Sequence, residues 1–203
     1  MRSHSSIILG ITGGIACGKT ETGRILAQAG FDVLDTDSMA HDLMKAGTST
    51  FEQVVEKFGK SILNPDGEMD RTQLGRLVFA DSSAREALNG LVHPAVIKAA
   101  EQWKAERTRE SAILVPLLFE AGWTEGWDAV VCVSADEDVV FQRLEKRGLN
   151  REEVRQRIAA QMPLVEKEIK SDFIIRNNKT LDALRKETLN VLERIRSRGN
   201  PHE

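Results

Sequence analysis

Five short apolar runs, separated by longer charged stretches of helical period, restrict this chain to a small set of folds. Apolar runs that do not alternate with polar residues are typical of strands buried on both faces, and helices between such strands make the sheet parallel. The sequence therefore predicts the α/β class, with a five-stranded parallel sheet in a three-layer core. The strands are expected at residues 7–11, 31–34, 112–115, 129–133 and 173–175.

The interval between the second and third runs is too long for a single crossover helix and has the pattern of a helical lobe. Helices are expected over 50–58, 71–79 and 82–89, followed by a longer helix that Pro94 opens, because proline suits the first position of a helix. We therefore assign residues 48–109 to an inserted helical lobe and residues 1–47 and 110–203 to the core.

A segment of mixed charge follows the fourth run and predicts two further helices. The first covers residues 137–146; Asn150 and Glu153 then match a capping box that starts a second helix, which Pro163 ends. We assign residues of about 143–162 to a helical lid. A final helix after Thr180 places one set of apolar residues on a single face, namely Leu181, Leu184, Val191, Leu192 and Ile195.

Residues 13–20, directly after the first strand, match the phosphate-loop motif G-x-x-x-x-G-K-[ST]. Its glycines let backbone N–H groups point inward, and the following helix N-terminus favours an anion. Lys19 would reach the β- and γ-phosphates and the Thr20 hydroxyl would bind Mg2+. A turn that binds nothing is the alternative, although such a turn has no use for Gly-Lys-Thr. Nucleotide contacts are expected from Gly14, Ile15, Ala16, Cys17, Gly18, Lys19, Thr20 and Glu21.

Two carboxylates, Asp35 and Asp37, follow the second strand. Ligands bind beyond the carboxyl ends of the strands in such sheets, and side chains one residue apart on extended backbone face opposite sides. We interpret Asp35 as a metal ligand and Asp37 as the base that accepts a proton from an acceptor hydroxyl. Capping of the next helix is the alternative.

Arginines gather around the capping box, and Arg143 and Arg147 lie four residues apart before Gly148, which is suited to a hinge. We interpret both as lid residues that contact the phosphates of ATP and stabilise developing charge. A solvated helix face of mixed charge is the alternative.

Other candidates border these segments. Pro116 cannot donate to a central ladder, so the third strand should end there and place residues 116–120 at the site edge. Glu120 either holds a basic group or a water molecule near the metal, or is a solvated loop acid. His41, four residues after Asp37, and His93 are candidate substrate contacts or simply structural residues, since neither has a metal-ligand partner at useful spacing.

In their order along the chain these segments resemble the dephospho-CoA kinase family from Ile7 to about Asn178. The resemblance implies a P-loop kinase core with an inserted acceptor-binding lobe, ATP and Mg2+ as cofactors, and dephospho-CoA as the small-molecule substrate. It also implies that Asp37 deprotonates the ribose 3′-hydroxyl, that Arg143 is a lid arginine and that Asn177 lies near adenine. The residues that carry it are 12–15 with 18–20, 35–37 with 40–41, 91–94, 116–120, and 157–158 with 161–163.

The chain departs from the family pattern at two places. Ala16 and Cys17 stand where Gly-Ser is common, and Ala16 is expected to need a negative φ; Arg176 replaces an acid before the Asn177 turn. Because the phosphate loop alone does not choose among P-loop kinases, another small-molecule kinase, acting on a nucleoside or shikimate, stays as an alternative, as does a non-catalytic nucleotide switch.

Composition excludes several other classes of function. The 28 basic and 31 acidic side chains give a net charge of −3, which predicts no nucleic-acid partner. The apolar runs are much shorter than the roughly 20 residues of a membrane span, and the amino terminus lacks a secretion signal, so we expect a cytoplasmic protein without a membrane or obligate protein partner. Cys17 and Cys132 are expected to be reduced, and the helix N-terminus at Cys17 can lower the pKa of its thiol.

Overall fold

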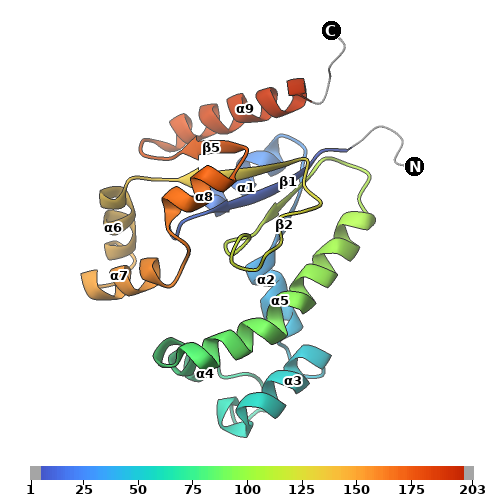
Figure 1. Ribbon diagram of the computed structural model, residues 1–203, viewed down its shortest axis with the longest axis vertical. Coiled ribbons are helices and arrows are strands. Elements are labelled where there is room, and N and C mark those ends of the chain that lie inside the picture. Colours follow the sequence, from blue (N-terminus) through green and yellow to red (C-terminus); the bar gives the residue numbers. More distant parts are fainter. Residues whose placement is uncertain (1–5, 199–203) are drawn as a thin grey trace. The chain divides into compact units, whose positions relative to one another are not determined.

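The computed structural model describes residues 6–198, and these divide into two compact units (Figure 1). The sheet unit comprises the chain through Asp35 and from Arg107 onward, and the helical unit is Thr36–Glu106. The helical unit thus begins earlier than the expected residue 48, because α2 (Thr36–Leu43) packs against α5 (Ser82–Ala105). Among residues 6–198 no helix combines the length and apolar character needed to cross a bilayer.

The sheet unit contains five parallel strands in the order β2-β3-β1-β4-β5, which confirms the predicted α/β class. The strand positions agree closely with the apolar runs. Because β1 is central, the turn that follows it lies in the middle of the carboxyl edge of the sheet, where ligands of such folds bind. The strands are β1 (Ile8–Gly13), β2 (Asp32–Asp35), β3 (Ser111–Leu114), β4 (Ala129–Ser134) and β5 (Phe173–Arg176).

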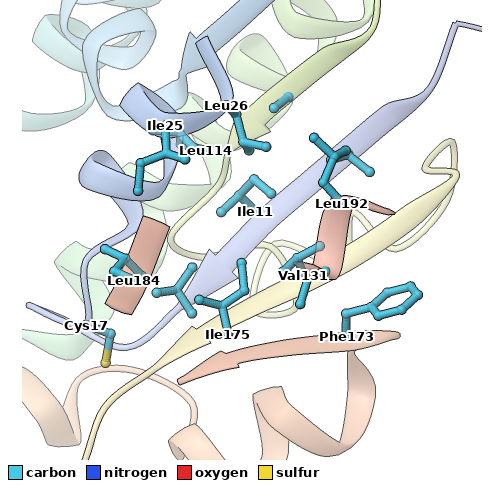
Figure 2. Close-up of a cluster of buried hydrophobic side chains, with 14 of the residues drawn as sticks. Ile11, Cys17, Ile25, Leu26, Leu114, Val131, Phe173, Ile175, Leu184 and Leu192 are labelled. Carbon is cyan, nitrogen blue, oxygen red and sulfur yellow. The ribbon is translucent and has the colours of Figure 1, made fainter. Parts of the chain in front are cut away.

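Helices α1 (Lys19–Gln28) and α9 (Leu181–Arg198) contact each other and cover one face of this sheet. Figure 2 shows side chains of α1 and α9 beside Ile11, Val131 and Ile175 of three adjacent strands. Most of the predicted apolar face of α9 is buried there. Leu181 is the exception: it is 66% exposed, because it occupies the first position of the helix, beyond the core.

Helices α6 (Glu137–Glu145) and α7 (Arg151–Ala159) match the two helices expected after β4. The capping box is confirmed: the Asn150 side chain accepts from the Glu153 N–H, and the Glu153 carboxylate accepts from the Asn150 N–H. Helix α7 ends at Ala159, before Pro163, close to the expected end. Pro163 directly precedes a further helix, α8 (Leu164–Lys170), which the sequence did not predict, and its fixed φ suits that position.

In the helical unit, α3 (Ser49–Phe58), a 3-10 turn (Lys60–Ile62) and α4 (Arg71–Ala80) precede α5. Contrary to expectation, Pro94 does not open a helix but lies inside α5. An internal proline removes a backbone hydrogen bond, yet Val92 and Val96 on either side of it are buried in the core of the unit. Burial of this face favours one continuous helix over two.

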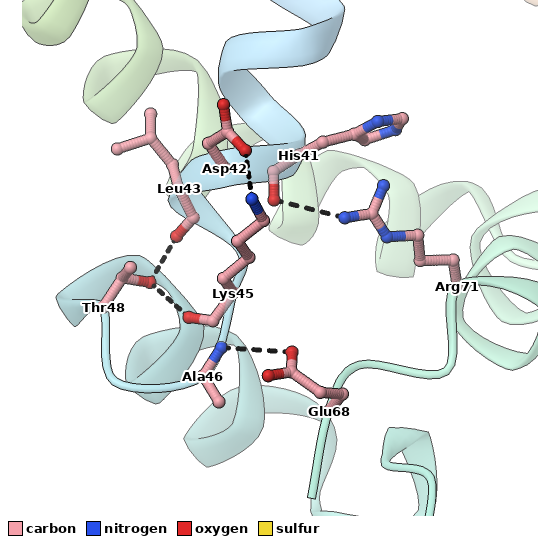
Figure 3. Close-up of polar contacts among 8 residues, drawn as sticks. All are labelled: His41, Asp42, Leu43, Lys45, Ala46, Thr48, Glu68 and Arg71. Carbon is pink, nitrogen blue, oxygen red and sulfur yellow. Dashed lines mark hydrogen bonds and ion pairs between the residues drawn. The ribbon is translucent and has the colours of Figure 1, made fainter.

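Polar contacts fix the carboxyl end of α2 within the helical unit (Figure 3). Thr48 caps α3 by accepting from the Phe51 N–H at 3.1 Å, and its hydroxyl bonds backward toward the carbonyls of the α2 terminus. Arg71 donates to the carbonyl oxygen of His41 at 3.2 Å. The helix that carries Asp37 and His41 is therefore tied to both α3 and α4.

Candidate active site

The turn between β1 and α1 has the geometry of a phosphate-binding loop. Gly13 has a φ of 141° and Gly18 a φ of 110°, conformations that disfavour any side chain. A Cβ atom at Gly13 would collide with the carbonyl of Val133, and one at Gly18 with the amide of Asn177. Both glycines of the motif are thus required by close approach of the backbone to its neighbours.

Lys19 lies at this loop, as its place in the motif predicts. Its Nζ donates to the carbonyl oxygens of Gly13 at 2.9 Å and Gly14 at 2.8 Å, so the ammonium group is held beside the loop. Thr20 is exposed in the first turn of α1. Glu21 forms an ion pair with Arg24 at 2.7 Å, which gives this carboxylate a partner on its own helix.

A pair of side chains from outside the loop holds its carbonyl groups. Arg143 of α6 donates to the Ala16 oxygen at 3.1 Å, to the Cys17 oxygen at 3.5 Å and to the Asn177 oxygen at 2.8 Å. The buried Asn177 amide also donates to the Cys17 oxygen, at 2.8 Å. The two arginines chosen from the sequence therefore differ, since Arg143 supports the loop whereas Arg147 is exposed.

Ala16 contradicts the expectation of a negative φ. Its φ is 55°, and no other residue except glycine among residues 6–198 has a positive value. The left-handed conformation costs an L-residue roughly 1–2 kcal/mol. The hydrogen bond from Arg143 to the Ala16 carbonyl helps to hold this strained residue, so the loop keeps the geometry that glycine usually provides.

Ala16→Gly is expected to raise the free energy of unfolding by about 1 kcal/mol, because relief of the left-handed strain exceeds the added freedom of glycine in the unfolded chain. Ala27→Gly, at an exposed helical position of α1, should lower it by about 1 kcal/mol. Urea denaturation of both variants measures the difference. Equal destabilisation by the two substitutions would show that Ala16 is unstrained.

The two cysteines of the sheet unit are free, buried thiols. Burial raises the pKa of the Cys17 thiol, and the positive charge of Lys19 opposes this only in part. Burial thus outweighs any lowering of this pKa by the helix N-terminus. Burial likewise raises the pKa of Cys132, to about 12, so neither position has the electropositive exposure of a reactive thiolate.

Asp35 and Asp37 were expected to lie on one extended segment, but they do not. Asp35 is the last residue of β2, whereas α2 begins at Thr36, so Asp37 projects from the first turn of a helix and is exposed. A carboxylate in that turn is favoured by the helix dipole. His41 lies in the last turn of α2, and His93 lies in α5, against which α2 packs.

Strand β3 ends at Leu114, and Pro116 follows it outside the ladder. Glu120 has the basic partner that was one of the alternatives for it, but this partner is a lysine that the sequence analysis missed. Nζ of Lys167 lies 2.8 Å from Glu120 Oε1 and also donates to the Pro116 oxygen at 2.8 Å. No motif or spacing marks Lys167, because the helix that carries it was itself unpredicted.

A cavity of about 370 Å³ adjoins the phosphate loop within the sheet unit. Its walls come from the loop, from the end of β4 with α6, and from the segment that joins α7 to α8. They are mainly apolar, with Glu137 and Gln161 as polar groups. The other lining residues are Gly14, Ile15, Cys17, Ala135, Val140, Ile158, Met162, Pro163, Leu164 and Val165.

The sequence profile of the family described as dephospho-CoA kinase matches residues 7–183 of this chain. The chain belongs to the dephospho-CoA kinase family. A dephospho-CoA kinase of Geobacillus kaustophilus is 38% identical to it over 193 residues, which span 93% of this chain and 96% of the relative. The predicted family is thereby confirmed.

Solved structures agree with this assignment. The dephospho-CoA kinase from Campylobacter jejuni superposes with a TM-score of 0.67 at 27% identity, over 95% of this chain and 98% of that one. A shikimate kinase from Acinetobacter baumannii, with a TM-score of 0.56 at 15% identity over 96% of this chain and 95% of the other, shares the fold alone. The three-layer core of this dephospho-CoA kinase family member is thus common to kinases of different acceptors.

Proposed function

We propose that this kinase transfers the γ-phosphoryl group of ATP to the ribose 3′-hydroxyl of dephospho-CoA and releases ADP and coenzyme A. Family membership over residues 7–183 is the observation that carries the proposal. The phosphate loop adds a physical reason, since α1 begins directly after it and the Lys19 ammonium lies beside it, and loop N–H groups with a helix N-terminus favour an anion.

In the proposed reaction the 3′-oxygen forms a bond to the γ-phosphorus while the bond from that phosphorus to the β–γ bridging oxygen breaks. The hydroxyl proton passes to the Asp37 carboxylate. Lys19 and the loop N–H groups bind the β- and γ-phosphate oxygens, where negative charge develops. Arg143 contributes by holding the loop carbonyls, and Arg147, which is exposed, is proposed to contact the phosphates from the lid.

The residues at the carboxyl edge of the sheet unit fit a magnesium ion. Thr20 is exposed in the first turn of α1, and the half-buried Asp35 is the last residue of β2; the hydroxyl and the carboxylate both supply the hard oxygen ligands that Mg2+ prefers. Such ions take their other ligands from phosphates and water. Bound there, Mg2+ would neutralise charge on the β- and γ-oxygens, with Thr20 and Asp35 as its protein ligands.

The acceptor is assigned mainly to the helical unit, where α2 carries His41 and α5 carries His93. These side chains can donate hydrogen bonds to a phosphate or hydroxyl of dephospho-CoA. Pro116 and Glu120 belong to the sheet unit, and both are engaged by Lys167. Their contribution to acceptor binding is therefore proposed to be the shape of the segment, not direct coordination of the ligand.

An acceptor panel tests this proposal. ADP release is followed with ATP and Mg2+ in the presence of dephospho-CoA, shikimate, a nucleoside or no acceptor, and the phosphorylated product is identified by mass spectrometry. We expect rapid turnover with dephospho-CoA and the mass of coenzyme A as product. Equal turnover with shikimate or a nucleoside would assign a different small-molecule kinase, and slow hydrolysis that no acceptor accelerates would assign a nucleotide switch.

A further inference from the structure

Lys167 is a charged side chain that is completely buried in the sheet unit. Its relative exposure is 0%, and its ammonium lies between the Glu120 carboxylate and the Pro116 carbonyl, each at 2.8 Å. Removing an ammonium group from water is costly, and an apolar residue of similar size often gives equal or greater stability. Stability alone therefore gives a weak reason for a lysine at this position.

The contacts of Glu120 indicate what the lysine does. Glu120 Oε1 accepts from Lys167 and also from the backbone N–H of Met162, at 2.9 Å. Met162 lies between α7 and α8, at the carboxyl end of the segment 143–162 that we assigned to the lid. A single carboxylate oxygen thus joins the lid terminus to the segment after β3, and Lys167 holds that carboxylate in place.

The anchored residues border the phosphate loop. Gln161, Met162 and Pro163 line the cavity of about 370 Å³. Gly14, Ile15 and Cys17 of the loop line the same cavity. A displacement of the lid terminus would therefore admit more water to this cavity, beside the loop where the γ-phosphate is expected.

We infer that Lys167 is a positioning residue: acting through Glu120, it fixes the carboxyl end of the lid so that the γ-phosphoryl group passes to the acceptor and not to water. The inference rests on the proposed function. When the anchor is lost, a water oxygen forms the bond to the γ-phosphorus, the bond to the β–γ bridging oxygen breaks as before, and the products are ADP and inorganic phosphate.

The test compares ADP formed with coenzyme A formed, in the presence of ATP, Mg2+ and dephospho-CoA. This ratio does not depend on how much of the protein is folded, so a merely structural role would not change it. The wild type is expected to give an ADP-to-coenzyme A ratio near one, with little hydrolysis. In Lys167→Met the hydrolysis, measured as the excess of ADP over coenzyme A, should rise roughly tenfold and raise the ratio above one. Lys167→Arg, which keeps the charge, should restore most of the coupling.

Two further variants separate positioning from stability. In Lys167→Met with Glu120→Gln no carboxylate is left unpaired, so thermal stability should recover while the raised ratio persists. Lys104→Met is the matched control, because Lys104 is another buried lysine, paired with Glu101 at 2.8 Å in α5, and its ratio should stay near one. A ratio unchanged in Lys167→Met, or returned to one in the double variant, would refute the inference.

Hydrogen exchange provides a measurement that needs no acceptor. Amide exchange on a peptide containing Met162 should be faster in Lys167→Met than in the wild type or in Lys104→Met, because the Met162 N–H loses a fixed hydrogen-bond acceptor. Unchanged amide exchange would show that Lys167 does not anchor the lid terminus, whichever molecule accepts the phosphoryl group. If the wild type forms no coenzyme A but exchange rises as expected, the proposed function fails and the anchor stands.

Discussion

Lys19→Met is expected to lower kcat/KM for ATP by roughly 10²–10³, the usual effect of removing one preorganised donor to developing charge. Methionine keeps the length of the side chain but removes the ammonium group that lies against the carbonyls of Gly13 and Gly14. Steady-state kinetics with dephospho-CoA as acceptor measures the loss. A fall in kcat that exceeds the rise in KM would show that Lys19 acts mainly in the transition state.

The matched control is Lys186→Met, which removes an exposed lysine from α9. Its kcat/KM should equal that of the wild type, and the thermal midpoints of both variants should stay close to the wild-type value. A Lys19→Met enzyme with full activity would remove the phosphate loop from the mechanism and leave only the family assignment.

The strands could be predicted because each apolar run lacks alternation and all but the third are followed by a helix, a combination with few structural solutions. Helix ends with side-chain caps were also predictable, as Asn150 and Glu153 demonstrate. Both features depend on neighbouring residues in the sequence. The features that could not be predicted depend on contacts between segments distant in the chain.

Pro94 illustrates this limit. Its local preference is to begin a helix, but burial of Val92 and Val96 on both sides of it outweighs one missing hydrogen bond. Ala16 is a second example, because its positive φ is supported by a hydrogen bond from Arg143, which lies 127 positions further along the chain. Local preference is therefore a poor guide where tertiary contacts hold the backbone.

The candidate site likewise contains residues that the local sequence identifies and residues that only tertiary contacts identify. The motif identified Lys19 and the two glycines, since phosphate binding needs those residue types at that spacing. It did not show that Arg143 and Asn177 bind loop carbonyls, because any arginine and asparagine close to the loop could do so. Lys167 could not be found at all, since its pairing with Glu120 exists only once α8 is packed against β1 and β4.

Asp37→Asn is expected to reduce kcat by about 10²–10⁴, the range for loss of a positioned general base, with little change in KM for ATP. Asparagine has the same shape as aspartate, and residue 37 is exposed in the first turn of α2, so the expected cost includes the helix-dipole contribution of about 0.3–1 kcal/mol to stability. Asp42→Asn is the control on the same helix: Asp42 pairs with Lys45 at 2.6 Å, and its hydrogen bond with that lysine lowers the pKa of the carboxyl. Asp42→Asn should keep full kcat. Equal activity in the two variants would exclude Asp37 as the base, and the proton would then have to leave through water or a phosphate oxygen of ATP.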